Sequence, residues 1–129
     1  MRDLVHNLGV TLALASAAQS ATVKGAAIDT AEFGSLMFVV TTGAVAGSGN
    51  FGITVQESDT TTDGDFTDAS ADSVIGSSLV NPVAADSIYK VGYNGSKRYA
   101  RLSVTKNSGT SVVIGAIAVK GDARHQPVA

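Results

Sequence analysis

The sequence predicts an all-β protein, a compact antiparallel β-sandwich or barrel of about seven to eight short strands with an N-terminal arm. Runs of apolar or alternating residues recur about every ten residues, and turn-forming residues separate them. The 14 glycines, with many Ala, Ser, Thr and Val residues, are typical of strands joined by frequent turns. Because 129 residues usually form one domain, we expect an arm at 1–20, a β domain at 21–121 and a tail at 122–129.

The first half of the β domain contains a weak strand and then a predicted hairpin. Residues 22–28 form the weak strand, and residues 35–42 form a short apolar run that is typical of a buried strand. The Gly-rich residues 43–50 allow the chain to reverse. In 51–56 apolar and polar residues alternate, as in a strand with one buried face. We therefore expect 35–42 and 51–56 to form a central hairpin, which a long acidic loop follows.

The second half of the domain begins with a brief apolar patch at 72–76 and a turn at 81–86. Residues 87–93 alternate in character and predict the next strand. Asn94-Gly95 follows directly and is the strongest short hairpin signal in the chain. The pattern therefore predicts a second hairpin at this point.

The last two predicted strands differ in the burial of their faces. Residues 98–106 alternate, so that their inward and outward sets can be separated. The inward residues are Ala100, Leu102 and Val104, and the outward residues are Tyr99, Arg101, Ser103 and Thr105. After a tight turn at 107–110, residues 112–119 are apolar on both faces, which indicates a central strand.

The N-terminal segment is apolar and open to two interpretations. Residues 8–17 resemble a secretory signal, but Asp3 beside Arg2 makes the leading segment barely basic. We favour an arm that is extended or forms a short helix. The apolar residues at helical spacing in it are Leu4, Val5, Leu8 and Leu12. Because free termini usually fray, an ordered arm of this kind is expected to lie against a partner surface.

Opposite charges are segregated along the chain, although the net charge is only −2. The acids between 25 and 89, a stretch without Lys or Arg, are Asp29, Glu32, Glu57, Asp59, Asp63, Asp65, Asp68, Asp72 and Asp86. The bases between 87 and 121, a stretch without acids, are Lys90, Lys97, Arg98, Arg101, Lys106 and Lys120. These groups can pair across strands within one monomer. Alternatively, the acidic loop of one subunit meets the basic strands of the next.

The sequence predicts no catalytic site. The two histidines, His6 and His125, lie near the termini, where a catalytic arrangement is hard to hold rigidly. The chain has no cysteine, and no phosphate-binding motif is present. We therefore expect neither an enzyme nor a bound cofactor.

The acidic loop is the one candidate for a metal site. Its possible calcium ligands are Asp59, Asp63, Asp65 and Asp68, with Gly64 for a sharp turn. Their spacing does not fit an EF-hand, and a solvated loop that protects a sheet end explains them better. No metal site is therefore predicted.

A nucleic-acid site and a membrane span are also not expected. Lys97, Arg98 and Arg101 lie among tyrosines at Tyr89, Tyr93 and Tyr99, a mixture that can bind single strands. Ion pairing on an outward strand face explains the same residues, and the total charge is acidic. No stretch approaches the roughly 18 apolar residues of a membrane-spanning helix.

Three stretches together carry a resemblance that covers most of the chain. They are Met1-Arg2-Asp3-Leu4 at the start of the arm, Gln56-Glu57-Ser58-Asp59 with Asp65-Phe66-Thr67-Asp68, and the segment from Tyr89 to Tyr99. The terminal Gln126-Pro127 also fits. With these features the chain resembles small virion proteins of tailed bacteriophages and prophages, and in particular capsid decoration (cement) proteins.

The resemblance implies a structural protein on the outer capsid surface that reinforces contacts between capsomers. Its partners would be the major capsid protein and further copies of itself, with a trimer favoured by analogy. From the sequence we expect the arm, with Met1, Leu4, Val5 and Leu8, to contact the capsid or a neighbouring subunit. We expect Asp63, Asp65 and Asp68 to face Lys97, Arg98 and Arg101 of an adjacent copy. The alternatives are a tail or head–tail connector subunit and a secreted calcium-dependent binding module.

Overall fold

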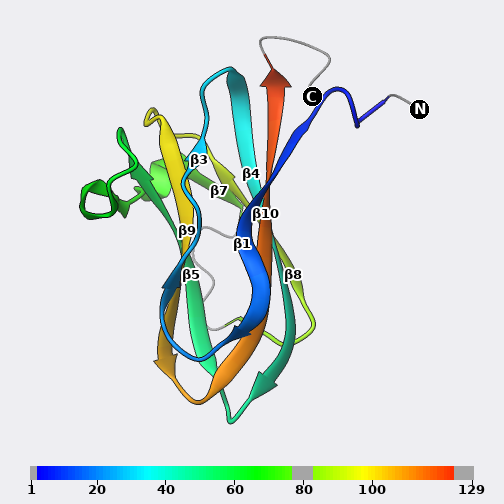
Figure 1. Cartoon of the computed structure of the whole chain (residues 1–129), viewed down its shortest axis with the longest axis vertical. Helices are drawn as coiled ribbons and strands as arrows, with labels where there is room; N and C mark the ends of the chain where they lie inside the picture. Colours follow the sequence, from blue (N-terminus) through cyan, green and yellow to red (C-terminus); the bar gives the residue numbers. More distant parts are fainter. Residues whose placement is uncertain (1–2, 77–82, 124–129) are drawn as a thin grey trace.

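The computed structural model describes residues 3–76 and 83–123, which form two antiparallel β-sheets packed face to face (Figure 1). The predicted all-β sandwich is therefore confirmed. Sheet A has the strand order β1-β10-β4-β8-β7. Its strands are β1 (Gly9–Gln19), β4 (Phe33–Ala46), β7 (Val74–Gly76), β8 (Ile88–Tyr93) and β10 (Ser111–Ala123).

Sheet B has the strand order β2-β9-β5-β6, and β3 also pairs with β9. Its strands are β2 (Val23–Lys24), β3 (Ile28–Asp29), β5 (Asn50–Ser58), β6 (Thr67–Asp68) and β9 (Tyr99–Ser108). Two short 3-10 helices, η1 (Asp63–Asp65) and η2 (Ala71–Ser73), lie between β5 and β7 in the chain. No helix in these two described ranges is long and apolar enough to span a membrane.

The core lies between the two sheets and consists of the inward side chains of alternating strand residues. Phe38 and Val40 of β4 and Ile114 of β10 contribute from sheet A, and Phe51 of β5 and Leu102 of β9 contribute from sheet B. Each of these five side chains is almost completely buried. The inward positions predicted for 98–106 are correct, since Ala100, Leu102 and Val104 are all buried.

Neither predicted hairpin forms. The residues of the first predicted pair lie in β4 and β5, which belong to different sheets, and the same is true of β8 and β9. The Gly-rich segment and Asn94-Gly95 therefore carry the chain from sheet A to sheet B. A turn signal specifies that the chain reverses, but two strands with buried apolar faces can meet across the sandwich instead of side by side.

Most of the segment expected to be an arm belongs to the sandwich. β1 pairs with β10 from Gly9↔Lys120 to Gln19↔Val112, and the helical alternative is therefore wrong for this stretch. Ala13 and Leu14 are buried, so the strand covers one end of the core. At the other terminus β10 extends to Ala123, two residues into the expected tail. Met1, residues 77–82 and residues 124–129, with His125, lie outside the described residues.

The outward set predicted for β9 is only partly correct. Thr105 is exposed, but Arg101 and Ser103 are buried. For Arg101 the reason is the segment between β5 and β6, which brings Phe66 onto the outer face of sheet B over the Arg101 guanidinium. A strand's alternation separates its two faces, but it does not show whether a loop covers the outer one.

Candidate interaction surface

The outer face of sheet A presents rows of apolar side chains. Residues that pair across antiparallel strands lie on the same face of a sheet, so the register identifies each row. One row joins Leu12, Ile117 and Val39 across β1, β10 and β4. The neighbouring row contains Val10, Val119 and Met37, followed by Gly92 of β8 and Ile75 of β7.

Several of these apolar side chains are largely exposed to solvent. Val10 is 64 % exposed, Leu12 60 %, Ile75 59 % and Ile117 38 %, and Ile88 of β8 reaches 66 %. A contiguous exposed apolar area of this kind marks a site of interaction with another molecule. We call these rows, with Ile88 and Lys90 of β8, the sheet A outer face.

Lys90 is the only charged residue in these rows. It pairs with Val39 in the register and is exposed. No ion pair joins Lys90 to an acid in the described part of the chain. The sheet A outer face is therefore apolar with one unpaired positive charge.

A groove of about 180 Å³ lies in this face where β1, β10 and β4 meet. Its lining residues are Leu12, Leu14, Ser16, Val39, Thr41, Gly115, Ala116 and Ile117. The pairing of β1 with β10 is irregular between Leu12 and Ala17. Gly115 lies so close to β1 that a Cβ there would be 2.9 Å from the Cα of Ser16. The glycine therefore allows this close approach of the two strands, and the hollow lies beside the irregular pairing.

The residues before β1 form a compact turn that exposes two apolar side chains. Asp3 Oδ1 accepts a hydrogen bond from the backbone N–H of Val5 at 2.8 Å, and Asp3 Oδ2 contacts His6 Nδ1. The carbonyl of Leu4 accepts hydrogen bonds from Asn7 and Leu8. Leu4 and Val5 are 66 % and 78 % exposed, whereas Leu8 is half-buried. We call Asp3–Leu8 the N-terminal turn.

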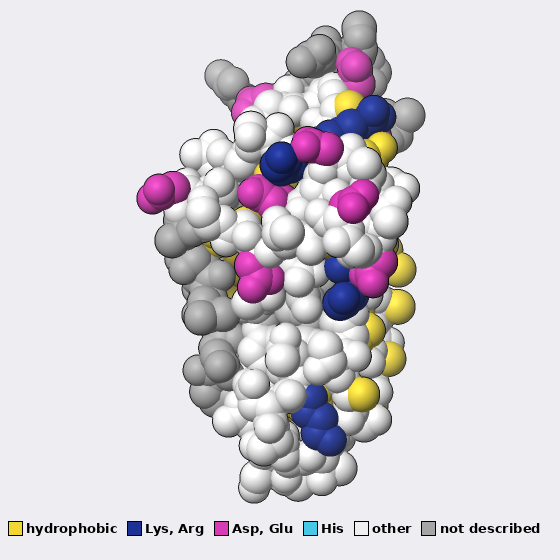
Figure 2. Space-filling model, turned by 90° about the vertical axis from the view of Figure 1, so that its left-hand side faces the viewer, with side chains coloured by type: hydrophobic (Ala, Val, Ile, Leu, Met, Phe, Trp, Pro, Cys, Tyr) yellow, Lys and Arg dark blue, Asp and Glu magenta, His cyan; other side chains and the backbone are white. Residues whose placement is uncertain are grey.

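Three of the basic residues singled out from the sequence form ion pairs with acids of the same chain. Arg101 Nη1 lies 2.7 Å from Asp63 Oδ1, Lys97 Nζ lies 2.9 Å from Asp59 Oδ2, and Arg98 Nη2 lies 2.9 Å from Asp29 Oδ2. Figure 2 shows acidic and basic side chains side by side on this face. Pairing within one monomer, the first of the two predicted alternatives, is therefore found for these residues, and their pairing between subunits stays a prediction.

Local interactions also fix the charge of these groups. The hydrogen bond from Arg101 lowers the pKa of Asp63, and the one from Arg98 lowers the pKa of Asp29. The hydrogen bond with Asp59 raises the pKa of Lys97. Each shift favours the charged form of the group at neutral pH.

The four aspartates considered as calcium ligands are not brought together. Asp65 accepts a hydrogen bond from Thr60 Oγ1 at 2.6 Å, and Asp68 accepts one from Gln56 Nε2 at 3.1 Å. Asp63 and Asp59 are engaged in the ion pairs above. Within residues 3–76 and 83–123 no group of three or more His, Asp or Glu side chains has a geometry that could hold a metal ion.

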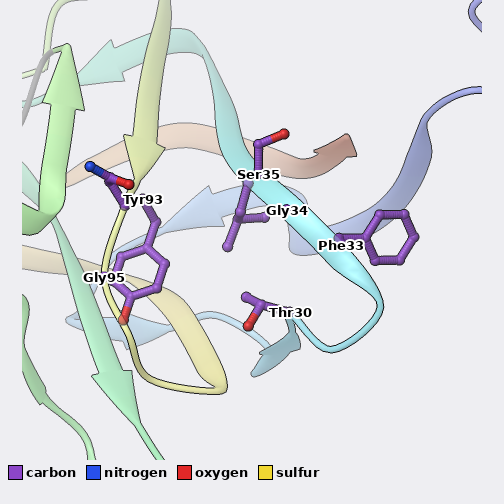
Figure 3. Close-up of a pocket in the computed structure, with 8 residues that line it drawn as sticks. Thr30, Phe33, Gly34, Ser35, Tyr93 and Gly95 are labelled. Atoms are coloured by element: carbon purple, nitrogen blue, oxygen red, sulfur yellow. The ribbon is translucent and has the colours of Figure 1, made fainter. Parts of the chain in front are cut away.

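A second, polar hollow lies beside Tyr93 and has a volume of about 90 Å³ (Figure 3). Tyr93 and Gly95 line one side of it and Thr30 another, while the Phe33 ring points away. The Tyr93 hydroxyl donates a hydrogen bond to Glu57 Oε2 at 2.9 Å and accepts one from the backbone N–H of Lys97. Small-molecule pockets usually measure about 300–1,000 Å³. The hollow is therefore a packing feature around the buried tyrosine.

Sequence reasoning predicted a contact at the N-terminal turn residues, which stays a prediction, but it did not indicate the sheet A outer face. The signal was present in 112–119, where both faces of the strand are apolar. That pattern predicts a strand buried on both sides. β10 is central within its sheet, but one of its faces points away from the core, so the outward apolar residues remain available to a partner.

Comparison with known proteins gives only distant similarities. No family model matches the chain, and no curated protein matches it. Among solved structures, the crystal structure of PirA is similar with 19% identity and a TM-score of 0.40, covering 89% of this chain and 84% of that one. The SPBc2 prophage-derived protein YomS is similar with 15% identity and a TM-score of 0.47, covering 92% of this chain and 99% of that one. The chain is thus distantly similar in structure to a prophage-derived protein.

Proposed function

We propose that this chain is a structural protein of a phage virion that binds the outer capsid surface and reinforces contacts between capsomers. The proposal rests first on the resemblance of its sequence to small virion proteins of tailed bacteriophages. The observation that carries it is the sheet A outer face, which exposes large apolar side chains from β1, β7, β8 and β10. The partner is the major capsid protein.

The energetics favour a role in assembly for this face. Fully burying one large aliphatic side chain contributes roughly 1.5–3 kcal/mol. Leu12, Ile75 and Ile88 leave most of that contribution unused in the isolated chain, since each is more than half exposed. One of its rows also crosses all five strands of sheet A, and this extent suits a broad protein surface better than a small molecule. A shell subunit offers such a surface in many identical copies.

The first test is the copy number of the chain in purified particles, measured by quantitative mass spectrometry against the major shell protein. We expect a ratio near one to one or a fixed fraction set by the shell symmetry. A handful of copies per particle would assign the chain to the tail or connector instead. Absence from particles would refute the proposal.

A variant then tests the surface itself. We expect Ile75→Ser combined with Ile88→Ser to lower retention on particles, because both side chains are exposed on the sheet A outer face. Thr105→Ser, at an exposed position of β9 in the other sheet, is the control and should be retained like the wild type. Full retention of the double variant would count against this face as the shell contact.

A further inference from the structure

The N-terminal turn and the groove are both apolar, and both are exposed in the single chain. Leu4 and Val5 are the exposed apolar side chains of the turn. The groove is lined by apolar side chains from three strands of sheet A. We propose that the N-terminal turn of one copy docks into the groove of a second copy. This contact would link neighbouring copies of the protein. Only the statement that these copies lie on a capsid rests on the proposed function.

The sizes agree. An apolar cavity of about 150 Å³ is sufficient to hold a benzene molecule. The groove, at about 180 Å³, therefore accommodates one large aliphatic side chain with part of a second. Leu4 and Val5 provide side chains of this combined size. A drug-sized ligand needs a larger pocket.

The turn cannot fill the groove of its own chain. It ends at Leu8, and β1 then runs away from it along sheet A. Leu12, the first lining residue on β1, is four positions further, about 13 Å along an extended strand. The high exposure of Leu4 and Val5 agrees with this geometry. A second copy must supply the occupant.

The charges agree as well. Lys90 pairs in the register with Val39, a lining residue of the groove, and makes no ion pair in the described part of its chain. The turn carries Asp3 directly before its two apolar residues; the Asp3 carboxylate contacts His6 within the turn, and about half of the side chain remains exposed to a second partner. A symmetric contact of two sheet A outer faces would offer Lys90 no acid, because these rows contain none. The charges therefore favour docking of the N-terminal turn into the groove over a symmetric contact of two sheet A outer faces.

The turn is also preorganised for docking. Its backbone is held by the hydrogen bonds to Asp3 Oδ1 and to the Leu4 carbonyl. A segment that is already ordered loses less conformational entropy on binding. Because turn and groove are different surfaces, the contact is head-to-tail, and such contacts form a ring when the rotation closes.

Three matched variants of the full chain test the contact by analytical ultracentrifugation. The turn variant is Leu4→Ser with Val5→Ser, and the groove variant is Leu12→Ser with Ile117→Ser. The control variant is Ile75→Ser with Ile88→Ser, which changes the same face outside the groove. Circular dichroism and thermal melting establish that each variant folds.

We expect the wild type and the control variant to form oligomers. The turn and groove variants should each weaken association by about tenfold or more, as the loss of two buried aliphatic side chains implies. An equimolar mixture of the two should form dimers and nothing larger, because only the intact turn of one and the intact groove of the other can meet. Lys90→Glu should weaken the wild-type contact, and Lys90→Gln should do so less.

Other results overturn the proposal. These are a monomeric wild type at all concentrations, unchanged association of the turn or groove variant, or a mixture that stays monomeric. The assay needs no particles, so its outcome is separate from that of the proposed function. A chain that forms these oligomers but is absent from virions refutes only the capsid role, and a monomeric chain found on capsids refutes only the contact between copies.

Discussion

The guanidinium carbon of Arg101 lies 4.1 Å from the centroid of the Phe66 ring, on the outer face of sheet B. The same guanidinium donates a hydrogen bond from Nε to Gln56 Oε1 at 2.9 Å and pairs with Asp63. Arg101 is only 6 % exposed as a result. One buried cation therefore fastens the acidic segment between β5 and β6 to the sheet.

The Phe66 ring should be essential for this attachment. We expect Phe66→Ala to destabilise the protein by about 3 kcal/mol, because it removes a buried ring and uncovers the Arg101 side chain. Urea denaturation measures the change in the free energy of unfolding. Thr61→Ala, at an exposed position of the same segment, is the control and should stay within about 0.5 kcal/mol of the wild type. Equal midpoints for both variants would contradict this role of the ring.

The shape of the Arg101 guanidinium should matter as much as its charge. Arg101→Lys keeps the positive charge, but a lysine cannot stack a planar group on Phe66 while it bonds both Gln56 and Asp63. We expect a loss of about 1–3 kcal/mol in the free energy of unfolding and faster protease cleavage within residues 59–65. Lys106→Arg, a change of cation elsewhere on β9, should have little effect. A lysine variant as stable and as protease-resistant as the wild type would show that charge alone suffices.

Tyr93 should make stability depend on pH in the alkaline range. Burial, together with the hydrogen bond to Glu57, raises the pKa of Tyr93 to about 12. The folded state therefore holds this proton more tightly than the unfolded state, whose tyrosine pKa is about 10. The associated stability is complete below about pH 10 and is lost as the pH rises toward about 12.

The test is Tyr93→Phe, with unfolding measured from pH 8 to 12. The variant should be less stable at neutral pH by about 1–2 kcal/mol, because it loses both hydrogen bonds of the hydroxyl. It should also lose stability less steeply than the wild type above about pH 10. Tyr99→Phe keeps the Tyr93 hydroxyl and should retain the wild-type slope. Parallel curves for Tyr93→Phe and the wild type would exclude this origin of the pH dependence.

Gly109 should be required for the turn between β9 and β10. Its φ of +80° is a left-handed conformation, and a Cβ at this position would collide with the carbonyl oxygen of Ser48. We expect Gly109→Ala to cost more than about 1 kcal/mol, which thermal unfolding would detect. Gly64→Ala is the matched control, since a Cβ at Gly64 meets nothing within 4 Å. The same melting temperature for both variants would be inconsistent with strain at Gly109.

The sequence predicted the charge pairs only as one of two alternatives. The acids and bases lie in separate stretches, so their pairing depends on which strands become neighbours. Gln56↔Arg101 and Ser58↔Tyr99 in the β5–β9 register bring the two stretches together. β5 and β9 are far apart in the sequence, so no local pattern predicts that they pair.

The sequence by itself determined the fold class, the approximate strands and the inward residues of β9, because alternation and turn chemistry are local properties of the chain. The tertiary structure shows what no local pattern predicts: the chain crosses from sheet A to sheet B after β4 and again after β8, Gly9–Gln19 joins sheet A, and Phe66 covers Arg101. It also decided that one apolar face of β10 points outward, where Ile117 is partly exposed. Each of these features depends on contacts between segments that are distant in the sequence. A periodic pattern within one segment does not predict which other segment it contacts.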